Sequence, residues 1–187
     1  MLTNITYITP NINKQTWELG KEIGYAFEEY IYKILVKCLG ATFSKDINIQ
    51  QTETTRDGGK DIIIDTSRDI NLFGVPITLK GKDKLKIYIE CKSSSYDTIA
   101  YEKFAKNAIL AGQNHVDYLV LVTNKTITPF SYYSTEELTK NYDCEFILID
   151  QYILASYLEA HNLDKWNYDK PSFDNSMIAL SYQVSKD

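Results

Sequence analysis

Two charged residues stand in the middle of an apolar strand, and this pattern restricts the fold more than any other feature of the sequence. The segment KIYIECKSS, residues 86–94, carries Glu90 and Lys92 one residue apart. Earlier in the chain, Asp61 opens the short apolar segment DIIID, two residues after a turn predicted at Gly58-Gly59. Burying an unpaired charge costs several kcal/mol or shifts its pKa. These residues therefore lie either on a solvated face of a sheet or in a functional site.

Strand geometry brings the charges together, because successive side chains point to opposite faces. If the segment containing Asp61 pairs with residues 86–92, two carboxylates and an ammonium converge near the strand ends. The two faces of the second strand are expected to carry Ile87, Ile89 and Cys91 on one side and Tyr88, Glu90 and Lys92 on the other.

The chemistry of such a group is that of a divalent-cation site. Two adjacent carboxylates resist joint ionisation because their negative charges repel each other. Their hard oxygen atoms suit Mg²⁺, and a bound Mg²⁺ offsets this repulsion. Mg²⁺ held in this way can bind a phosphate oxygen, lower the pKa of a bound water and stabilise the leaving oxygen. Lys92 could orient the attacking water, help to deprotonate it, or offset charge on the phosphate. The alternative is a cross-strand ion pair on a surface-facing edge strand.

Apolar periodicity predicts alternating helices and strands along the chain. We expect helices over 14–39, 97–112 and 151–161, and a short helix over 134–142 opened by a Ser134/Thr135 cap, with Gly40 capping the first helix. We expect strands over 41–50, 61–65, 117–123 and 144–150, and hairpin arms within 67–92 with turns at 74–76 and 80–84. This order predicts a mixed α/β sandwich around one central sheet.

Length and composition are those of one globular domain, or of one domain plus a tail. The chain has 187 residues and a net charge of −5, which argues mildly against non-specific coating of nucleic acid. No apolar run approaches the roughly 20 residues of a membrane span, and the N-terminal residues do not resemble a signal peptide. The odd set of three cysteines is expected to be reduced, so we predict a cytoplasmic protein without a membrane partner.

At this point the motifs resemble a known family. Asp61 followed by Glu90-Cys91-Lys92 is similar to the split D…(D/E)-x-K signature of the PD-(D/E)XK nuclease superfamily. The fit is closer to the Mrr-like restriction endonucleases, whose segments read G-x-x-F-E, D-G-G-x-D-I and (Q/E)-C-K. This chain has GYAFE at 24–28, DGGKDI at 57–62 and IECK at 89–92, and the resemblance covers roughly residues 20–160.

The resemblance implies a restriction-endonuclease-like fold, with three α/β/α layers, a central mixed sheet and an inserted β-hairpin. It implies Mg²⁺-dependent cleavage of double-stranded DNA, with Mn²⁺ as a substitute. Asp61 and Glu90 would be metal ligands, together with the Cys91 backbone carbonyl, and Lys92 would be the catalytic lysine. Glu28 would be the supporting acid of the first helix, acting directly or through a water.

Helical angle supports Glu28 over its neighbour. With Phe27 at the centre of the buried stripe, Glu28 lies about 100° away at the edge of that stripe, and Glu29 lies about 200° away, facing water. Gly24, one turn earlier, leaves space for a ligand. The chain departs from many Mrr-like members in having Glu90 where they have Gln, and the segment after Thr123 lacks the expected small residues.

The remaining expectations follow from the resemblance and from mechanism. The nuclease domain is assigned to residues 1–163, and 164–187 to a tail or a linker toward a further domain. We expect a restriction or antiphage-defence effector that acts as a dimer or larger assembly, fused to or regulated by a sensor or NTPase module. Two alternatives stay open: a catalytically silent nucleic-acid-binding or assembly module, and a nuclease acting on RNA or branched DNA. The basic loop with Lys80, Lys82, Lys84 and Lys86 is either a phosphate-contacting arm or a solvated turn.

Overall fold

The computed structural model describes residues 17–40, 44–52, 61–93, 98–99 and 105–163, with the side chains of 17–23 and 98 left out. Five strands form the central sheet in the order β1-β2-β5-β7-β9. They are β1 Ile47–Gln51, β2 Ile62–Thr66, β5 Leu85–Lys92, β7 Tyr118–Thr123 and β9 Glu145–Ile149. The strands β1, β2 and β5 are antiparallel, whereas β5, β7 and β9 are parallel. The predicted mixed sheet is confirmed.

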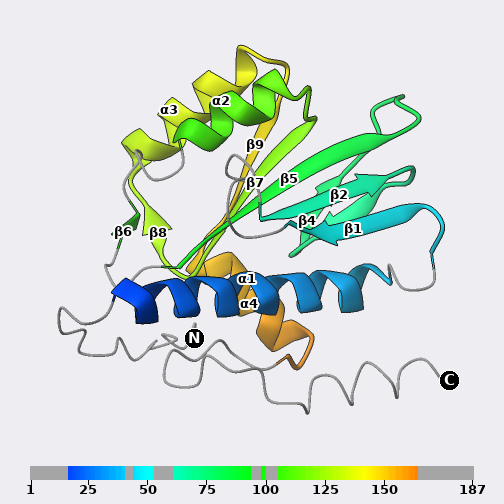
Figure 1. Ribbon diagram of the computed structural model, residues 1–187. Coiled ribbons are helices and arrows are strands. Elements are labelled where there is room, and N and C mark those ends of the chain that lie inside the picture. Colours follow the sequence, from blue (N-terminus) through cyan, green and yellow to red (C-terminus); the bar gives the residue numbers. More distant parts are fainter. Residues whose placement is uncertain (1–16, 41–43, 53–60, 94–97, 100–104, 164–187) are drawn as a thin grey trace, which may run out of the picture.

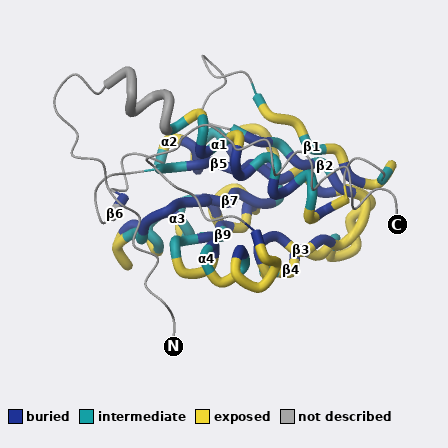
Figure 2. The backbone as a smooth tube through the Cα atoms, turned by 90° about the horizontal axis from the view of Figure 1, so that it is seen from below, coloured by how far each residue is buried: buried dark blue, intermediate teal, exposed yellow. Residues whose placement is uncertain are grey.

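Helices cover both faces of the sheet, so the predicted three layers are also confirmed (Figure 1). The helices α1 Trp17–Leu39 and α4 Gln151–Ala160 lie on one face, and α2 Ala105–Gln113 and α3 Pro129–Lys140 lie on the other. Each face has its own apolar core, and β5 and β7 run buried between the two (Figure 2). A short parallel ladder of β6 Thr98–Ile99 and β8 Thr126–Ile127 follows the ends of β5 and β7. None of the described helices is long and apolar enough to cross a membrane.

The inserted hairpin consists of β3 Ile70–Leu72 and β4 Val75–Ile77. Its turn is Phe73-Gly74, with φ of 52° and 89°, as a two-residue type I′ connection requires. The predicted turn at 74–76 is therefore misplaced, because Val75 and Pro76 belong to β4. The hairpin buries its apolar side chains in the same core as α1 and α4, so it completes that layer of the fold; these side chains are Ile70, Leu72, Phe73 and Ile77.

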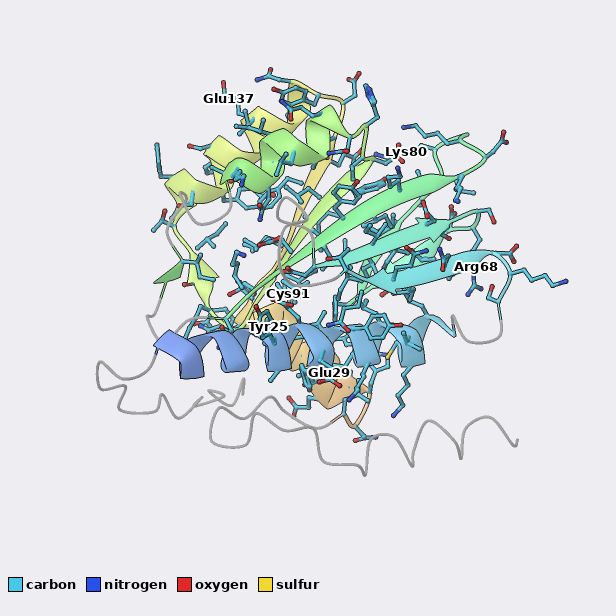
Figure 3. The ribbon with its side chains drawn as sticks, viewed as in Figure 1. Tyr25, Glu29, Arg68, Lys80, Cys91 and Glu137 are labelled. Carbon is cyan, nitrogen blue, oxygen red and sulfur yellow. The ribbon has the colours of Figure 1, made fainter. Side chains whose placement is uncertain are left out.

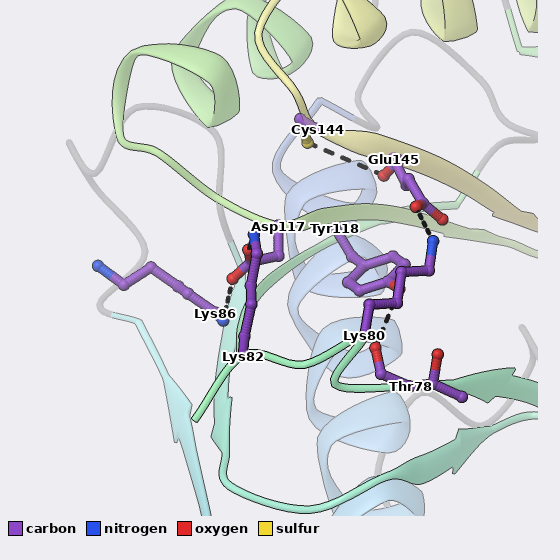
Figure 4. A network of polar contacts seen from close by, with 8 residues as sticks. All are labelled: Thr78, Lys80, Lys82, Lys86, Asp117, Tyr118, Cys144 and Glu145. Carbon is purple, nitrogen blue, oxygen red and sulfur yellow. Dashed lines mark hydrogen bonds and ion pairs between the residues drawn. The ribbon is translucent and has the colours of Figure 1, made fainter. Parts of the chain in front are cut away.

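The basic loop before β5 folds back on the sheet (Figure 4). Lys80 is ion-paired with Glu145, and Lys82 with Asp117, whose second oxygen accepts the Lys86 N–H at 2.7 Å. Asp117 and Glu145 stand at the starts of β7 and β9, while Lys92 ends β5. Because these strands are parallel, the loop lies at their N-terminal ends, whereas Lys92 lies at the C-terminal end of β5. This placement favours the solvated turn over the phosphate-contacting arm.

Some element boundaries differ from the predictions. Residues 44–46 form a turn before β1, and residues 98–99 belong to strand β6 rather than to the predicted helix over 97–112. The third helix begins five residues before the predicted cap, at Pro129, with Thr128 as its N-cap accepting from the Ser131 N–H. Proline is pre-organised for the first helical position, so Thr128-Pro129 starts the helix and Ser134 and Thr135 lie inside it. The predicted turn at Gly58-Gly59 and the tail 164–187 lie outside the described residues.

Candidate active site

The register of β2 and β5 places Asp61 beside Glu90. Ile62 is opposite Ile89, and the Asp61 N–H donates to the Ile89 carbonyl at 3.0 Å. The Cys91 N–H then donates to Asp61 Oδ2 at 2.6 Å. Asp61 Oδ1 accepts no hydrogen bond from a described residue. The expected pairing is therefore confirmed, and it holds the Asp61 carboxylate against the backbone of the segment that carries Glu90 and Lys92.

Glu90 and Lys92 form an ion pair on one face of β5. Glu90 is 2% exposed, and its Oε1 pairs with Lys92 Nζ. Glu90 Oε2 is buried and has no hydrogen-bond partner among the described residues. The predicted alternation is confirmed, since Tyr88 lies in the α2/α3 core whereas Ile87, Ile89 and Cys91 lie in the α1/α4 core.

Helix α1 brings Glu28 to the same end of β5. The helix packs on β5, and in Figure 3 Cys91 is drawn directly above the turn of α1 that carries Tyr25. Phe27 is fully buried, Glu28 is half-buried, and Glu29 is exposed and paired with Lys33 at 2.6 Å. These positions agree with the predicted helical angles. A Cβ built on Gly24 would meet no atom within 4 Å, so the expected space beside Glu28 is present among the described residues.

Burial raises the pKa of all three carboxylates, and repulsion from neighbouring carboxylates adds to the rise for Glu28 and Glu90. Burial, followed by the charges of Asp61 and Glu90, raises the pKa of Glu28 to about 8, although Lys92 opposes the shift. Burial and the Asp61 charge raise the pKa of Glu90 to about 7, again against Lys92. Burial also raises the pKa of Asp61, while Lys92 and the Cys91 N–H lower it. Among the described residues, Lys92 is the one cation that compensates these three acids.

Lys92 and Cys91 respond to the same local charge. Burial lowers the pKa of Lys92, but Glu90 and Asp61 outweigh burial, so its pKa is raised. Burial first, and then the nearby carboxylates, raises the pKa of the Cys91 thiol well above its usual range. A cysteine in this state is an inert core residue, as expected from its apolar face.

The donor set fits a hard divalent cation bound partly by water. No group of three or more His, Cys, Asp or Glu side chains is arranged to hold a metal ion within the described ranges. Mg²⁺, however, is usually bound by one or two carboxylates and keeps several waters. Asp61 and Glu90 supply two adjacent carboxylates, and the unpartnered Glu90 Oε2 is an oxygen acceptor without a donor. Their chemistry therefore suits Mg²⁺ or Mn²⁺ rather than a soft metal.

The structure also buries polar residues that the sequence did not single out. Asn107 of α2 is 6% exposed and lies close enough to the Glu90 carboxylate to lower its pKa. After β7, Thr123 and Lys125 are buried, and the Lys125 carbonyl accepts the Gln151 N–H at 3.0 Å at the start of α4. The one signal for Asn107 was a polar residue beside Ala108 and Ala111, the apolar positions of the predicted helix.

The family comparison agrees with this geometry. Residues 21–158 match the model of the Mrr catalytic-domain family, whose description is restriction endonuclease. The chain belongs to this family. It is therefore a nuclease of the restriction-endonuclease type, as its motifs indicated. No curated protein gave a match to the chain.

The match spans every part of the Mrr-family fold that carries the charged cluster. It begins within α1, upstream of Glu28, includes Asp61, Glu90 and Lys92, and ends in α4. The basic loop and the β3–β4 hairpin fall inside the same range. The hairpin therefore lies inside the Mrr catalytic domain rather than outside it.

Proposed function

We propose that this Mrr-family protein is a Mg²⁺-dependent endonuclease that hydrolyses phosphodiester bonds of double-stranded DNA, with Asp61, Glu90, Lys92 and Glu28 in its active site. One observation carries the proposal. Three carboxylates from α1, β2 and β5 meet at the end of β5, and one described ammonium group compensates them. A cluster of this kind costs stability in the apo protein, and a divalent cation offsets that cost.

Each acid has a distinct part in this proposal. Asp61 and Glu90 would hold the cation together with the Cys91 backbone carbonyl, and Glu28 would support it directly or through a water. The bound cation would supply Lewis-acid activation of the phosphate and charge stabilisation at the leaving oxygen. The Cys91 N–H fixes Asp61 Oδ2, so the Oδ1 atom is the one available for this role. Glu28 forms no ion pair or hydrogen bond with a described residue, which leaves its carboxylate available as well.

Lys92 would change partner when the site is loaded. In the structure its ammonium group pairs with Glu90 Oε1. Once a cation neutralises Glu90, Lys92 would be free to contact the phosphate or the attacking water. The ammonium group would then offset charge on the phosphate or position the water, and removing it is expected to cost activity more than fold stability.

The test is cleavage of supercoiled plasmid with Mn²⁺ at high protein concentration. The wild type is compared with Glu90→Ala and Lys92→Ala, and Lys86→Ala serves as the control because it removes a lysine from the other end of the same strand. Nicked or linear product is expected from the wild type and from Lys86→Ala, with a loss of about 100-fold or more in the two site variants. A single-stranded RNA substrate in parallel tests the preference for DNA.

Two results would count against the proposal. Equal cleavage by the wild type and by both site variants would mean that a contaminant or another site is responsible. An uncut plasmid, together with no heat of Mn²⁺ binding in calorimetry, would mean that the charged cluster is not a metal site. If Mn²⁺ binds and the plasmid stays intact, the catalytically silent module is the better description of the isolated chain.

A further inference from the structure

Two complementary polar atoms face the same buried region without partners. One is Glu90 Oε2, an acceptor on β5, and the other is Asn107 Nδ2, a donor on α2. Neither atom has a hydrogen-bond partner among the described residues, although Asn107 lies close enough to Glu90 to lower the pKa of that carboxylate. The two residues are 2% and 6% exposed, so water is largely excluded from both.

This arrangement is unfavourable for the fold alone. A buried polar group without a partner costs about 1–3 kcal/mol. The neighbours of Asn107 on the inner face of α2 are Ala108 and Ala111, which pack in the apolar α2/α3 core. An apolar side chain of similar size would suit this position better than an amide does. A residue that reduces stability next to a charged cluster is a candidate for a role in that cluster.

The state of Glu90 indicates what that role is. Its Oε1 is held by Lys92, and this ion pair points the carboxylate toward its own strand neighbour. To hold a cation, Glu90 has to release Lys92 and keep a defined orientation without it. A donor on the adjacent helical layer can supply that orientation through the second oxygen, because α2 packs over the face of the sheet on which Glu90 lies.

We propose that Asn107 is a positioning residue for Glu90: its side-chain amide donates to Glu90 Oε2 and holds the carboxylate in the orientation that binds the divalent cation. The inference rests on the proposed function, because it assigns Glu90 as a metal ligand. It adds α2 to the elements that build the site, alongside α1, β2 and β5. Asn107 acts through Glu90 and touches neither substrate nor cation.

The experiment measures Mn²⁺ affinity by titration calorimetry on the full chain, and the unfolding temperature in EDTA. Asn107→Leu removes the donor and keeps the number and branching of the side-chain heavy atoms, Asn107→Ala removes the donor and most of the side chain, and Asn107→Ser keeps a shorter donor. The matched control is Thr135→Val on α3. Thr135 is another fully buried polar side chain of this helical layer, and its hydroxyl donates within its own helix to the Ser131 carbonyl at 2.7 Å.

For Asn107→Leu, we expect a loss of Mn²⁺ affinity without a loss of thermal stability. Its Mn²⁺ affinity should fall by about 10-fold or more, as is typical when a group that orients a metal ligand is lost. Its unfolding temperature in EDTA should stay equal or rise, because an unpartnered amide has been removed. Asn107→Ala should lose similar affinity, Asn107→Ser should retain part of it, and Thr135→Val should bind as the wild type does.

Wild-type Mn²⁺ affinity in both Asn107→Leu and Asn107→Ala would overturn the inference and leave the proposed nuclease intact. Equal loss in Thr135→Val would also overturn it, since the effect would then reflect general disturbance of the α2/α3 layer. Failure of the wild type to bind Mn²⁺ would overturn this inference and the metal-dependent function together. If Asn107→Leu does not fold, Asn107→Ala and Asn107→Ser decide, because neither adds an atom to the core.

Discussion

The Glu28 carboxylate lies between α1 and the end of β5, where the nearby charges are mostly negative. Burial and the charges of Asp61 and Glu90 raise its pKa from 4.5 to about 8. The folded apo protein therefore binds a proton at this site that the unfolded chain releases. Stability from this group is fully present below pH 4.5 and is lost as the pH rises through about 8. This change of stability with pH is opposite in sign to that of an ordinary salt-bridged carboxylate, which loses its stabilising effect as the pH falls.

The first prediction is a pH-dependent stability that Glu28 controls. In EDTA, the unfolding temperature of the wild type should fall between pH 5.5 and 8.5. Glu28→Gln should reduce that fall and should be more stable than the wild type at pH 8.5 by on the order of 1–2 kcal/mol, allowing for the partial exposure of Glu28. Differential scanning calorimetry at several pH values measures both effects.

The control for this prediction is the next residue along the helix. Glu29 is exposed and paired with Lys33, so Glu29→Gln should leave the pH dependence unchanged. Addition of Mg²⁺ should raise the wild-type unfolding temperature at pH 8.5 more than at pH 5.5, because ionised carboxylates bind it better. A Glu28→Gln variant with the wild-type pH slope would show that folding does not raise the pKa of Glu28.

At the scale of elements, each of the four described helices is followed at its C-terminal end by a residue with positive φ. Gly40 ends α1 with φ of 62°, as the sequence predicted, but His115, Asp143 and Asn162 end the other three with φ of 52°, 55° and 50°. After α2 the Val116 N–H donates to the Ala111 carbonyl at 3.1 Å, and the His115 N–H donates to Gly112 at 3.1 Å. These bonds form a Schellman motif, in which glycine is the favoured residue.

The second prediction concerns this helix end. His115→Gly should stabilise the protein by about 0.5–1 kcal/mol, because glycine adopts the left-handed conformation without the steric cost of a Cβ. Asn162→Gly is the comparison, and it should gain less, since asparagine tolerates this region better. Chemical denaturation of both variants measures the difference. A loss of stability in His115→Gly would mean that the exposed imidazole makes a favourable interaction at the helix end.

The third prediction concerns the contact between α2 and the turn after α3. A Cβ on Gly112 would lie closer to the Cβ, Cγ and Cδ2 atoms of Tyr142 than van der Waals contact allows. Gly112→Ala should therefore destabilise the protein by about 1–3 kcal/mol. Gly24→Ala, in the open stretch of α1, should instead stabilise it by about 0.5–1 kcal/mol. Thermal unfolding of the two variants gives changes of opposite sign if the packing is as described.

At the scale of the whole molecule, the two groups of lysines have separate tasks. Lys92 compensates the carboxylates at the end of β5, while Lys80, Lys82 and Lys84 pair with Glu145, Asp117 and Asp65 at the other edge of the sheet. These loop lysines are neutralised locally. They therefore hold the loop on the starts of β7 and β9 and add little to any attraction for nucleic acid.

The fourth prediction follows from that separation. The double variant Lys80→Ala/Lys82→Ala should cleave plasmid at the wild-type rate. Its DNA binding should depend on salt concentration as that of the wild type does. Its unfolding temperature should fall only slightly, because exposed ion pairs contribute little to stability. Gel-shift titrations at several salt concentrations measure the slope. A clearly shallower slope in the double variant would mean that the loop contacts phosphates after all.

The sequence predicted those parts of the molecule that depend on local period and register. Alternation along residues 86–92 separated the charged face from the core face, because side chains alternate in any strand. Helical angle distinguished the half-buried Glu28 from the exposed Glu29, because each residue of a helix is rotated by about 100° from the one before. The sandwich around one central sheet followed from the order of the apolar segments, whereas the family came from the motifs around Asp61 and Glu90, and the mixed sheet and three layers came from that resemblance.

Tertiary structure alone decided what depends on contacts between distant segments. The sequence left the basic loop open between an arm and a solvated turn, because Glu145 and Asp117, the partners of Lys80 and Lys82, stand 65 and 35 residues away. Asn107 looked like an ordinary helix residue because its neighbour Glu90 belongs to another layer. The raised pKa of Glu28 depends on burial and on charges from two other segments, Asp61 before β2 and the Glu90/Lys92 pair of β5. Burial and long-range charge arise only when the layers of the fold come together, so local periodicity of the sequence does not predict them.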